Sequence, residues 1–374
     1  MNTHRKNILA LASWYPSRVF LDNGDFIQRH LRAISMLNDV TLVHAVKDEQ
    51  LKTSVEIEEK INQNVREIIV YFKPSFFHPF NLILQIRAFL KGISLVKEVD
   101  LIHLNVVYPA GLVAIYLKKR FQKKIVLTEH WSGLQANNFK KLAFYKKKLI
   151  KLILRNVDVI MPVSAYLKNE ISKLVAHKEY EIIPNVVDLE LFKVLNSEKE
   201  TKVKFLHLSN LDDKVKNISA MLNATKRLNE EGFSFEFHFG GNGDSSFITK
   251  FSQEYQLENI IKTLGRLEHN EVGEKMNQMH CFVLFSHYEN QPCVQIEAFA
   301  SGIPVIAKNV GGIAEFFPED FGILVNNEEQ LYSAMKEVIK GKKFQPATQL
   351  NEYANQHFSA IEIAKKYNKI YSKL

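Results

Sequence analysis

The sequence predicts an α/β protein of two domains, each built on a doubly wound, mostly parallel β-sheet. Its 374 residues are about twice a common domain length. Short apolar runs alternate with helical patterns along the whole chain, as in βαβ units with buried parallel strands. Residues 183–192 contain a proline, lack apolar periodicity and separate two such series. We therefore expect the domain boundary there, with domains of residues 1–185 and 186–354.

The expected strands are short and largely apolar. In the first half they are Asn7–Ser13, Val40–Ala45, Glu67–Phe72, Leu101–Asn105, Ile125–Thr128, Val159–Pro162 and Tyr180–Ile183. In the second half they are Val203–Ser209, Phe235–Gly240, Ile260–Leu264, Cys281–Ser286, Pro304–Ala307 and Gly322–Val325. The last segment, from about Ala347 onward, has a helical pattern.

The composition, 46% hydrophobic and 24% charged, is that of a globular protein and excludes collagen-like, coiled-coil and disordered classes. No run of about 18 uncharged apolar residues predicts a membrane-spanning helix. The N-terminal apolar stretch ends at Ser13 and Trp14 without a small-residue cleavage site, so we interpret it as a strand and not a signal peptide. Two cysteines cannot form a disulfide framework, which favours a reducing cytoplasm.

The two halves differ in charge. Residues 1–190 carry a net charge of +10, and the remainder carries −2. A basic half suggests a phosphate-rich ligand or an anionic membrane surface, although a solvated lysine-rich surface is the simpler interpretation. Nucleic acid is not an expected partner, because no nucleic-acid module is recognisable and few aromatic residues alternate with the charges.

Polar and glycine-rich segments follow several expected strands of the second half. Glu289 and Glu297 lie in a turn and in the helix after residues 281–286, and that helix is expected to begin near Pro292. Lys216 follows the strand of residues 203–209, where an ammonium group can reach a diphosphate. Gly241 and Gly311 open turns in which backbone amides can approach an anion. All four segments would share one sheet edge, whereas each alone would be a weak signal.

These segments together resemble glycosyltransferase family 4, a group of retaining, nucleotide-sugar-dependent enzymes with the GT-B fold. The matching text is Ile183-Pro-Asn-Val-Val-Asp, Lys216-Asn217, Gly241-Asn-Gly-Asp, Gly265-Arg, Glu289 to Glu297 with Glu-Asn-Gln-Pro, Ala300-Ser-Gly-Ile-Pro-Val and Gly311-Gly-Ile-Ala-Glu. The resemblance implies two Rossmann-like domains facing across a cleft. The first is the acceptor side, the second binds the nucleotide sugar, and a C-terminal helix of about residues 355–374 packs back on the first.

The resemblance also assigns roles in the second half. Lys216 would bind the donor diphosphate and stabilise the leaving group, and Glu289 would contact the transferred sugar. Glu297 would hold the ribose hydroxyls. Further donor contacts would come from Asn290, Gln291 and Gly241. Many family members place an arginine where this chain has Asn210, so the diphosphate loses one cation, for which Arg266 is a weak substitute.

In the first half the resemblance is looser. Gly24 matches a loop near the donor phosphate, and Thr128-Glu129-His130 matches the family's Thr-x-His, whose histidine contacts the donor sugar. The alternative is that His130 is a loop histidine whose hydrogen bonds are satisfied within the protein. Asn105 could contact the acceptor, although a strand-end cap is the more common role for such a residue. Ser164 is expected to cap a helix.

Two segments of the basic half suggest a membrane contact. Residues 140–155 carry seven positive charges and no acid, with apolar positions near helical spacing. Phe76 and its neighbours up to Leu84 offer aromatic side chains. An ordinary lysine-rich surface helix is the alternative.

The expected function is therefore retaining, metal-independent transfer of a hexose-type sugar from a nucleoside-diphosphate sugar to a glycan or lipid-linked glycan, in cell-surface polysaccharide synthesis. No cofactor is expected besides this co-substrate, and the expected location is the cytoplasm or the inner face of the plasma membrane. The alternatives are a GT-B epimerase or phosphorylase and a non-catalytic nucleotide-sugar-binding partner of another transferase.

Overall fold

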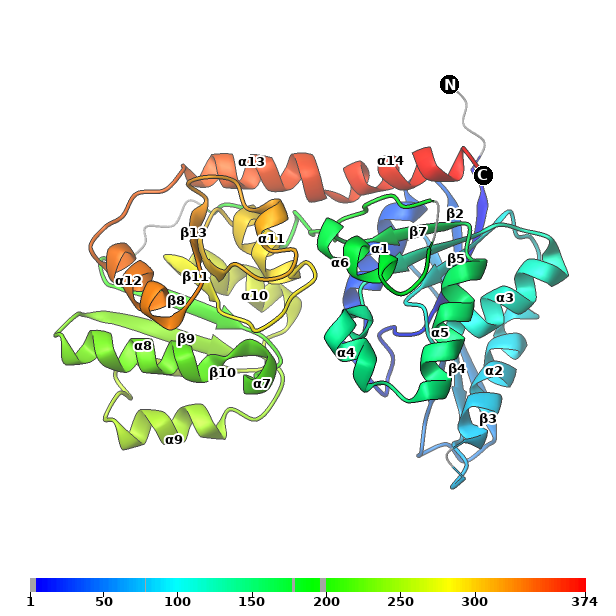
Figure 1. The fold of residues 1–374 in the computed structure, drawn as a ribbon, viewed down its shortest axis with the longest axis horizontal. Helices are drawn as coiled ribbons and strands as arrows, with labels where there is room; N and C mark the ends of the chain where they lie inside the picture. The colour runs from blue at the N-terminus through cyan, green and yellow to red at the C-terminus, as the bar shows by residue number, and fades with distance from the viewer. Residues whose placement is uncertain (1–4, 78, 177–178, 196–199) are drawn as a thin grey trace. The chain divides into compact units, whose positions relative to one another are not determined.

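The computed structural model describes residues 5–77, 79–176, 179–195 and 200–374. The chain divides into two compact units. Unit 1 comprises Met1–Val186 and Ala360–Leu374, and unit 2 comprises Val187–Ser359 (Figure 1). Each unit contains a largely parallel sheet with helices on both faces, which confirms the predicted fold class.

The described residues of unit 1 form a seven-stranded sheet in the order β3-β4-β2-β1-β5-β6-β7. All neighbours pair in parallel except the edge strand β3, which is antiparallel to β4. The strands are β1 (Asn7–Ala12), β2 (Asp39–Lys47), β3 (Val55–Asn62), β4 (Val65–Phe72), β5 (Leu101–Asn105), β6 (Ile125–Glu129) and β7 (Val159–Pro162).

Alternate side chains of this sheet enter two cores, because successive residues of a strand point to opposite faces. Leu9 and Leu11 of β1 face one core, and Ile8 and Ala10 face the other. Helices α2 (Phe80–Ile93), α3 (Ala110–Phe121), α5 (Phe144–Asn156) and α6 (Ala165–Ser172) cover the first face. Helices α1 (Asp25–Ser35) and α14 (Ala360–Tyr371) cover the second. The short elements η1 (Ser132–Leu134) and α4 (Ala136–Lys141) follow β6.

The described residues of unit 2 form a six-stranded parallel sheet in the order β10-β9-β8-β11-β12-β13. Its strands are β8 (Val203–Leu208), β9 (Phe235–Gly240), β10 (Ile261–Gly265), β11 (Cys281–Leu284), β12 (Val305–Lys308) and β13 (Gly322–Val325). One face packs on α8 (Ile218–Glu230), α9 (Ser246–Glu254) and α12 (Glu328–Ile339). The other packs on α10 (His269–Asn277), α11 (Cys293–Ala300) and α13 (Ala347–Phe358). The short elements α7 (Asp213–Lys216) and η2 (Ala314–Phe316) complete the unit.

Two strand predictions were wrong. Strand β3 was not predicted, because half of its eight residues are charged and it lies at an edge of the sheet. Conversely, Tyr180–Ile183 is not a strand, and only an isolated bridge joins Tyr180 to Ile160. This segment follows β7 through backbone bonds, but Pro162 has no N–H to return, so the ladder does not continue.

Two helix predictions need correction. Residues 140–155 do not form one helix, since α4 ends at Lys141 and the chain is extended at Leu142 and Ala143 before α5. The C-terminal segment is likewise two helices, α13 and α14, broken at Ser359, which bridges to Val187. The chain passes from unit 2 back to unit 1 at this break. The predicted cap is confirmed, because the Ser164 hydroxyl accepts a hydrogen bond from the Leu167 amide.

Candidate active site

The sheet of unit 2 has a point where chain connections diverge. Strand β8 comes first in the sequence of this unit but lies between β9 and β11 in the sheet. Strands β9 and β10 therefore extend the sheet on one side of β8, and β11, β12 and β13 extend it on the other. Ligands of such sheets bind outside the carboxyl ends of the strands at this point. The loop after β8 carries Lys216 and the loop after β11 carries Glu289. These two predicted residues therefore flank the position that the topology favours for a ligand.

Lys216 and Glu289 form a direct ion pair. The Lys216 Nζ donates to the Glu289 Oε1 at 2.6 Å, and the two side chains are only 18% and 12% exposed. The two loops are also joined by their backbones, since the His287 amide donates to the Val215 carbonyl at 2.8 Å. A pair that is largely removed from water interacts more strongly than one on an open surface.

Glycines bring other backbone segments close to this pair. Gly311 has a φ of +60°, and a Cβ there would lie 1.8 Å from the carbonyl oxygen of Glu289. Gly241 has a φ of +129°, and a Cβ there would lie 1.7 Å from the carbonyl oxygen of Ser209. Only glycine fits these close approaches, so both glycines fix the shape of the loops at the carboxyl edge.

Glu297 lies in the second turn of α11 and is 3% exposed. Its Oε1 is 4.0 Å from the Nε2 of His269, at the first position of α10. Asn290 and Gln291 are buried in the loop before α11. Gln295 ties α11 to the segment after Gly311 by donating to the carbonyls of Ile313 and Phe316.

Asn210 is exposed, and its Oδ1 accepts from the Asp212 amide at 3.4 Å. Arg266 follows β10, and its guanidinium lies 3.3 Å from Glu268. The Gly241 amide donates to the carbonyl of Gly265, which brings the loop after β9 beside the start of the Arg266 segment.

His207 was not predicted as a site residue. Its ring is fully buried at the end of β8, where Nδ1 lies 2.8 Å from the Val283 carbonyl and Nε2 lies 2.9 Å from the Ser209 hydroxyl. Burial lowers the pKa of His207 to about 4, and the positive charge of Lys216 acts in the same direction. The ring is thus neutral and joins β8, β11 and the loop that leads to Lys216. Its position one residue before a strand end was the only sequence signal.

The ring of His130 is enclosed by other side chains of unit 1. His130 packs against Phe26 and His30, with ring centroids 4.5 and 5.1 Å away. Burial lowers the pKa of His130 well below its ordinary value, and the neighbouring His30 adds to this effect, while a hydrogen bond to the Asn185 side chain opposes it. A neutral His130 is therefore expected at neutral pH, and its contact with a donor sugar stays a prediction.

Gly24 and Asn105 each lie close to backbone atoms of unit 1. Gly24 precedes α1 with a φ of +81°, and a Cβ there would lie 2.8 Å from the backbone of Trp14. Asn105 is fully buried at the end of β5, with its Nδ2 3.4 Å from the His103 carbonyl. Whether either residue contacts a substrate stays a prediction.

The described residues contain no group of three or more His, Cys, Asp or Glu side chains arranged to hold a metal ion. Nor is any helix within residues 5–77, 79–176, 179–195 and 200–374 both long enough and apolar enough to cross a bilayer.

Comparison with known proteins identifies the family to which the chain belongs. Residues 27–191 match the family described as Glycosyltransferase Family 4, and residues 190–357 match Glycosyl transferases group 1. An uncharacterised glycosyltransferase of Methanocaldococcus jannaschii is 26% identical over 299 residues, 77% of this chain and 80% of that protein. One subunit of the phosphatidylinositol N-acetylglucosaminyltransferase of Homo sapiens is 27% identical over 236 residues, 61% of this chain and 48% of that protein.

Solved structures agree on the fold. The Anabaena protein HepE in complex with UDP superposes with a TM-score of 0.77 at 16% identity, covering 99% of this chain and 100% of that one. The two consecutive family matches cover most of the chain, and the solved structure shares its fold, so the chain is a glycosyltransferase with the GT-B fold.

Proposed function

We propose that this glycosyltransferase transfers a hexose-type sugar from a nucleoside-diphosphate sugar, with retention of configuration and without a bound metal ion, to a glycan or lipid-linked glycan. We further propose that it acts in cell-surface polysaccharide or glycolipid synthesis, in the cytoplasm at the inner face of the membrane. The observation that carries the proposal is the Lys216–Glu289 pair at the carboxyl edge of β8 and β11. The human relative, whose name gives a phosphatidylinositol acceptor, supports a lipid-linked acceptor.

In this proposal the ion pair opens when the donor binds. The donor diphosphate competes with Glu289 for the Lys216 ammonium, which then stabilises the charge that develops on the leaving nucleoside diphosphate. The released Glu289 carboxylate accepts hydrogen bonds from hydroxyls of the transferred sugar. Glu297 accepts from the ribose hydroxyls, and the amides of the Gly241 and Gly311 turns face the phosphates.

The first test is a thermal-shift screen with UDP-glucose, GDP-glucose and ADP-glucose on the wild-type chain and on Glu297→Ala. A ligand at 100 times its dissociation constant stabilises the fold by about 2.7 kcal/mol. We expect one nucleotide sugar to raise the melting temperature of the wild type and to have little effect on the variant. If none of the three shifts the wild type, the donor assignment is wrong.

The second test separates binding from chemistry. Glu289→Gln keeps the size of the side chain but removes its charge, so we expect donor binding to persist while turnover falls by roughly 100-fold. The anomeric configuration of the product, measured by proton NMR, tests retention. Full turnover in Glu289→Gln would contradict the assigned role. Free nucleotide released without any acceptor would instead favour an epimerase, and donor binding without any turnover would favour a non-catalytic partner.

A further inference from the structure

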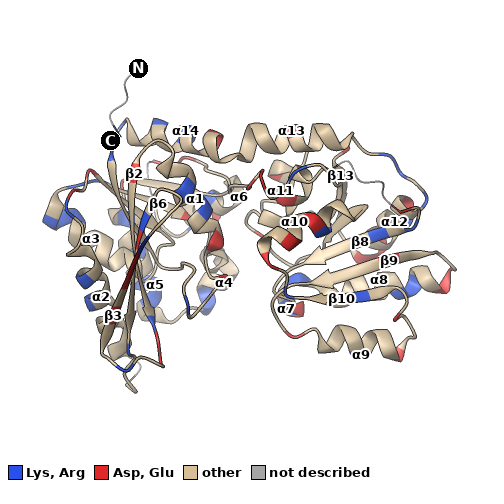
Figure 2. Cartoon of the chain, turned by 180° about the vertical axis from the view of Figure 1, so that it is seen from behind, with Lys and Arg blue, Asp and Glu red and all other residues tan. Residues whose placement is uncertain are grey.

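The loop after β8 holds Lys216 in an unusual backbone conformation. Lys216 is the last residue of the four-residue helix α7, which contains acidic and basic residues and lies near the carboxyl edge of the sheet (Figure 2). Leu211, before α7, has a φ of +55°, and Asn217, after it, has a φ of +52°. Asparagine tolerates this left-handed region, but a leucine there is rare and costs free energy, so other contacts must hold Leu211 in place.

The Ser209 hydroxyl makes one of these contacts. Its Oγ accepts a hydrogen bond from the Leu211 amide at 3.0 Å, two residues further along the chain. Such a bond between a serine side chain and a nearby amide is weak by itself. The Ser209 Oγ also lies 2.9 Å from the Nε2 of His207, which gives the hydroxyl a second partner. The Leu211 side chain is buried as well, in the core that also contains residues of α8.

His207 fixes the direction of these hydrogen bonds. Its Nδ1 lies 2.8 Å from the Val283 carbonyl, which can only accept, so Nδ1 carries the proton. Burial lowers the pKa of His207 to about 4, so the ring is neutral at pH 7 and Nε2 is an acceptor. The Ser209 hydroxyl therefore donates to Nε2, and its oxygen lone pairs remain for the Leu211 amide. These groups form one series of hydrogen bonds, from the Leu211 amide to the Val283 carbonyl, in which each donor meets an acceptor.

The series of hydrogen bonds lies where β8 and β11 separate. The last pair in the register of these two strands is Leu206 with Phe282. One residue further along β8, the His207 ring contacts the Val283 carbonyl and so joins the two strands through a side chain. Beyond this point each strand leads into one of the two loops that carry the ion pair. The ring thus connects both strands just before the positions of the paired side chains are set.

Backbone contacts extend this support from Leu211 to Lys216. Asp212 follows Leu211 and caps α7, since its side chain accepts from the Lys214 amide. The Lys216 amide donates to the Asp212 carbonyl at 2.7 Å. A shift at Leu211 therefore moves the whole of α7 and Lys216 with it. After burial, the positive charge of Lys216 further lowers the pKa of His207, so the ammonium group and the ring lie close enough to interact.

We propose that His207 is a positioning residue for the transfer reaction: through the Ser209 hydroxyl it holds the loop of residues 209–217 so that the Lys216 ammonium meets the diphosphate of the donor. In this proposal His207 acts only through Ser209 and does not contact the donor. The inference rests on the proposed function, in which Lys216 binds the donor diphosphate, and adds to it the side chains that keep this ammonium in place.

The test compares the binding of a nucleoside diphosphate with that of the matching monophosphate. UDP and UMP, GDP and GMP, and ADP and AMP are titrated against the full chain by calorimetry, and the pair that binds the wild type is used for the variants. The preference for the diphosphate measures the contact of Lys216 with the second phosphate, whereas general damage to the fold weakens both ligands alike. We expect Lys216→Ala to lower this preference by about tenfold.

The variants of the series of hydrogen bonds should have the same effect. Ser209→Ala should lower the preference about tenfold, and so should His207→Asn, which keeps an amide N–H for the Val283 carbonyl but does not reach Ser209. Because the two residues act in series, the double variant should fall no further than either single variant. Ser209→Thr keeps the hydroxyl and should retain the preference. The matched control is His238→Asn, which changes a buried histidine of the neighbouring strand β9 that bonds to Glu236, and it should leave the preference unchanged.

A second measurement examines the tautomer of His207 directly. In nitrogen NMR of the chain labelled at its histidines, the signals that disappear in His207→Asn should show a protonated Nδ1 and an unprotonated Nε2 at pH 7. The opposite tautomer would overturn the inference, because Nε2 could then not accept from Ser209. An unchanged preference for the diphosphate in Ser209→Ala, or losses that multiply in the double variant, would overturn it as well.

Failure of this inference can be told apart from failure of the proposed function. If Lys216→Ala lowers the preference for the diphosphate but Ser209→Ala and His207→Asn do not, only the positioning role fails. If Lys216→Ala keeps the preference, or if none of the three nucleoside diphosphates binds the wild type, the proposed role of Lys216 in donor binding fails, and the positioning role fails with it.

Discussion

Gly311 is the residue on which the position of Glu289 depends most directly. Its φ of +60° is strained for other residues, and any Cβ would collide with the Glu289 carbonyl at 1.8 Å. The turn therefore holds the backbone of the loop after β11, and through it the carboxylate that pairs with Lys216.

We expect Gly311→Ala to lower the free energy of unfolding by more than about 1 kcal/mol, because it adds a backbone collision to the left-handed strain. It should also reduce turnover by displacing Glu289. Gly341→Ala is the matched control, since Gly341 has a φ of +87° but nothing within 4 Å of its added Cβ. The measurements are urea unfolding and donor turnover, and equal effects of the two substitutions would show that strain alone matters.

The sequence allowed prediction that Lys216, Glu289 and both turn glycines lie at one edge of the sheet, because the residues that follow the strand ends of one parallel sheet meet there. It could not show that Lys216 bonds directly to Glu289, since that depends on side-chain conformation. Nor could it show that the buried His207 ring joins β8 to β11, since that depends on its contact with the Val283 carbonyl. Both facts arise from contacts distant in sequence.

Helix α14 is held to unit 1 by a continuous hydrogen-bonded chain of side chains. The Tyr371 hydroxyl lies 2.7 Å from His103 Nδ1, and His103 Nε2 lies 2.7 Å from the Thr128 hydroxyl. The Thr128 hydroxyl lies 2.9 Å from the Tyr367 hydroxyl, which is also 2.9 Å from His30 Nδ1. All five side chains are fully buried, so α14 contributes specific polar contacts to the unit as well as apolar area.

We expect Tyr367→Phe to destabilise the protein by about 1–3 kcal/mol, because it leaves the buried His30 Nδ1 without this hydrogen bond and removes one of the two hydrogen bonds of the Thr128 hydroxyl. Hydrogen exchange measured by mass spectrometry should show faster exchange in β5, β6 and α14 and little change in β8 and β11. Lys365→Ala, on the exposed face of the same helix, is the control and should be nearly neutral. Protection that falls equally in both units would contradict a local role.

Other element-level features explain where sequence analysis failed. Strand β3 and β4 are joined by Gln63 and Asn64, both with positive φ, which is the geometry of a tight hairpin turn. Asn64 is typical of such a turn, but the charged residues before it are not typical of a strand, so the sequence did not predict the hairpin. The break between α4 and α5 contains neither proline nor glycine, so apolar spacing alone could not separate the two helices.

Across the whole molecule, buried neutral histidines are concentrated in unit 1. Burial lowers the pKa of His30 to about 4, of His44 to about 4 and of His103 to about 3. Unfolding restores each pKa toward 6.5, so the unfolded chain binds more protons below that pH, and the stability present above pH 6.5 is lost as the pH falls toward 4.

At pH 5 the expected loss is roughly 2 kcal/mol for each of these histidines. Unit 1 should therefore open before unit 2, in which His207 is the one described histidine whose pKa is lowered to about 4. Hydrogen exchange at pH 7 and pH 5, compared between β1 and β8 peptides, measures this difference. Exchange protection in β1 that does not change over this range would contradict it.

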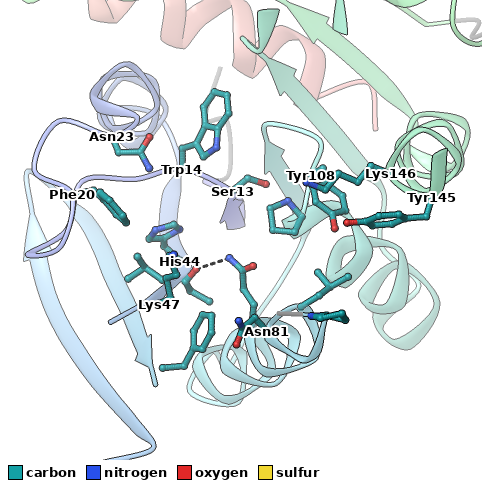
Figure 3. Close-up of a pocket in the computed structure, with 17 residues that line it drawn as sticks. Ser13, Trp14, Phe20, Asn23, His44, Lys47, Asn81, Tyr108, Tyr145 and Lys146 are labelled. Atoms are coloured by element: carbon teal, nitrogen blue, oxygen red, sulfur yellow. Dashed lines mark hydrogen bonds between the residues drawn. The ribbon is translucent and has the colours of Figure 1, made fainter. Parts of the chain in front are cut away.

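Both tryptophans of the chain, Trp14 and Trp131, lie in unit 1 with ring centroids 6.2 Å apart. Trp14 also lines a pocket of about 730 Å³ at the carboxyl edge of the unit 1 sheet (Figure 3). Tryptophan fluorescence excited at its red edge therefore reports on unit 1 alone. Quenching of this fluorescence by a ligand would measure binding to the pocket without any label. This fluorescence should not change when a nucleotide sugar binds at the carboxyl edge of β8, unless binding alters the surroundings of the two indole rings.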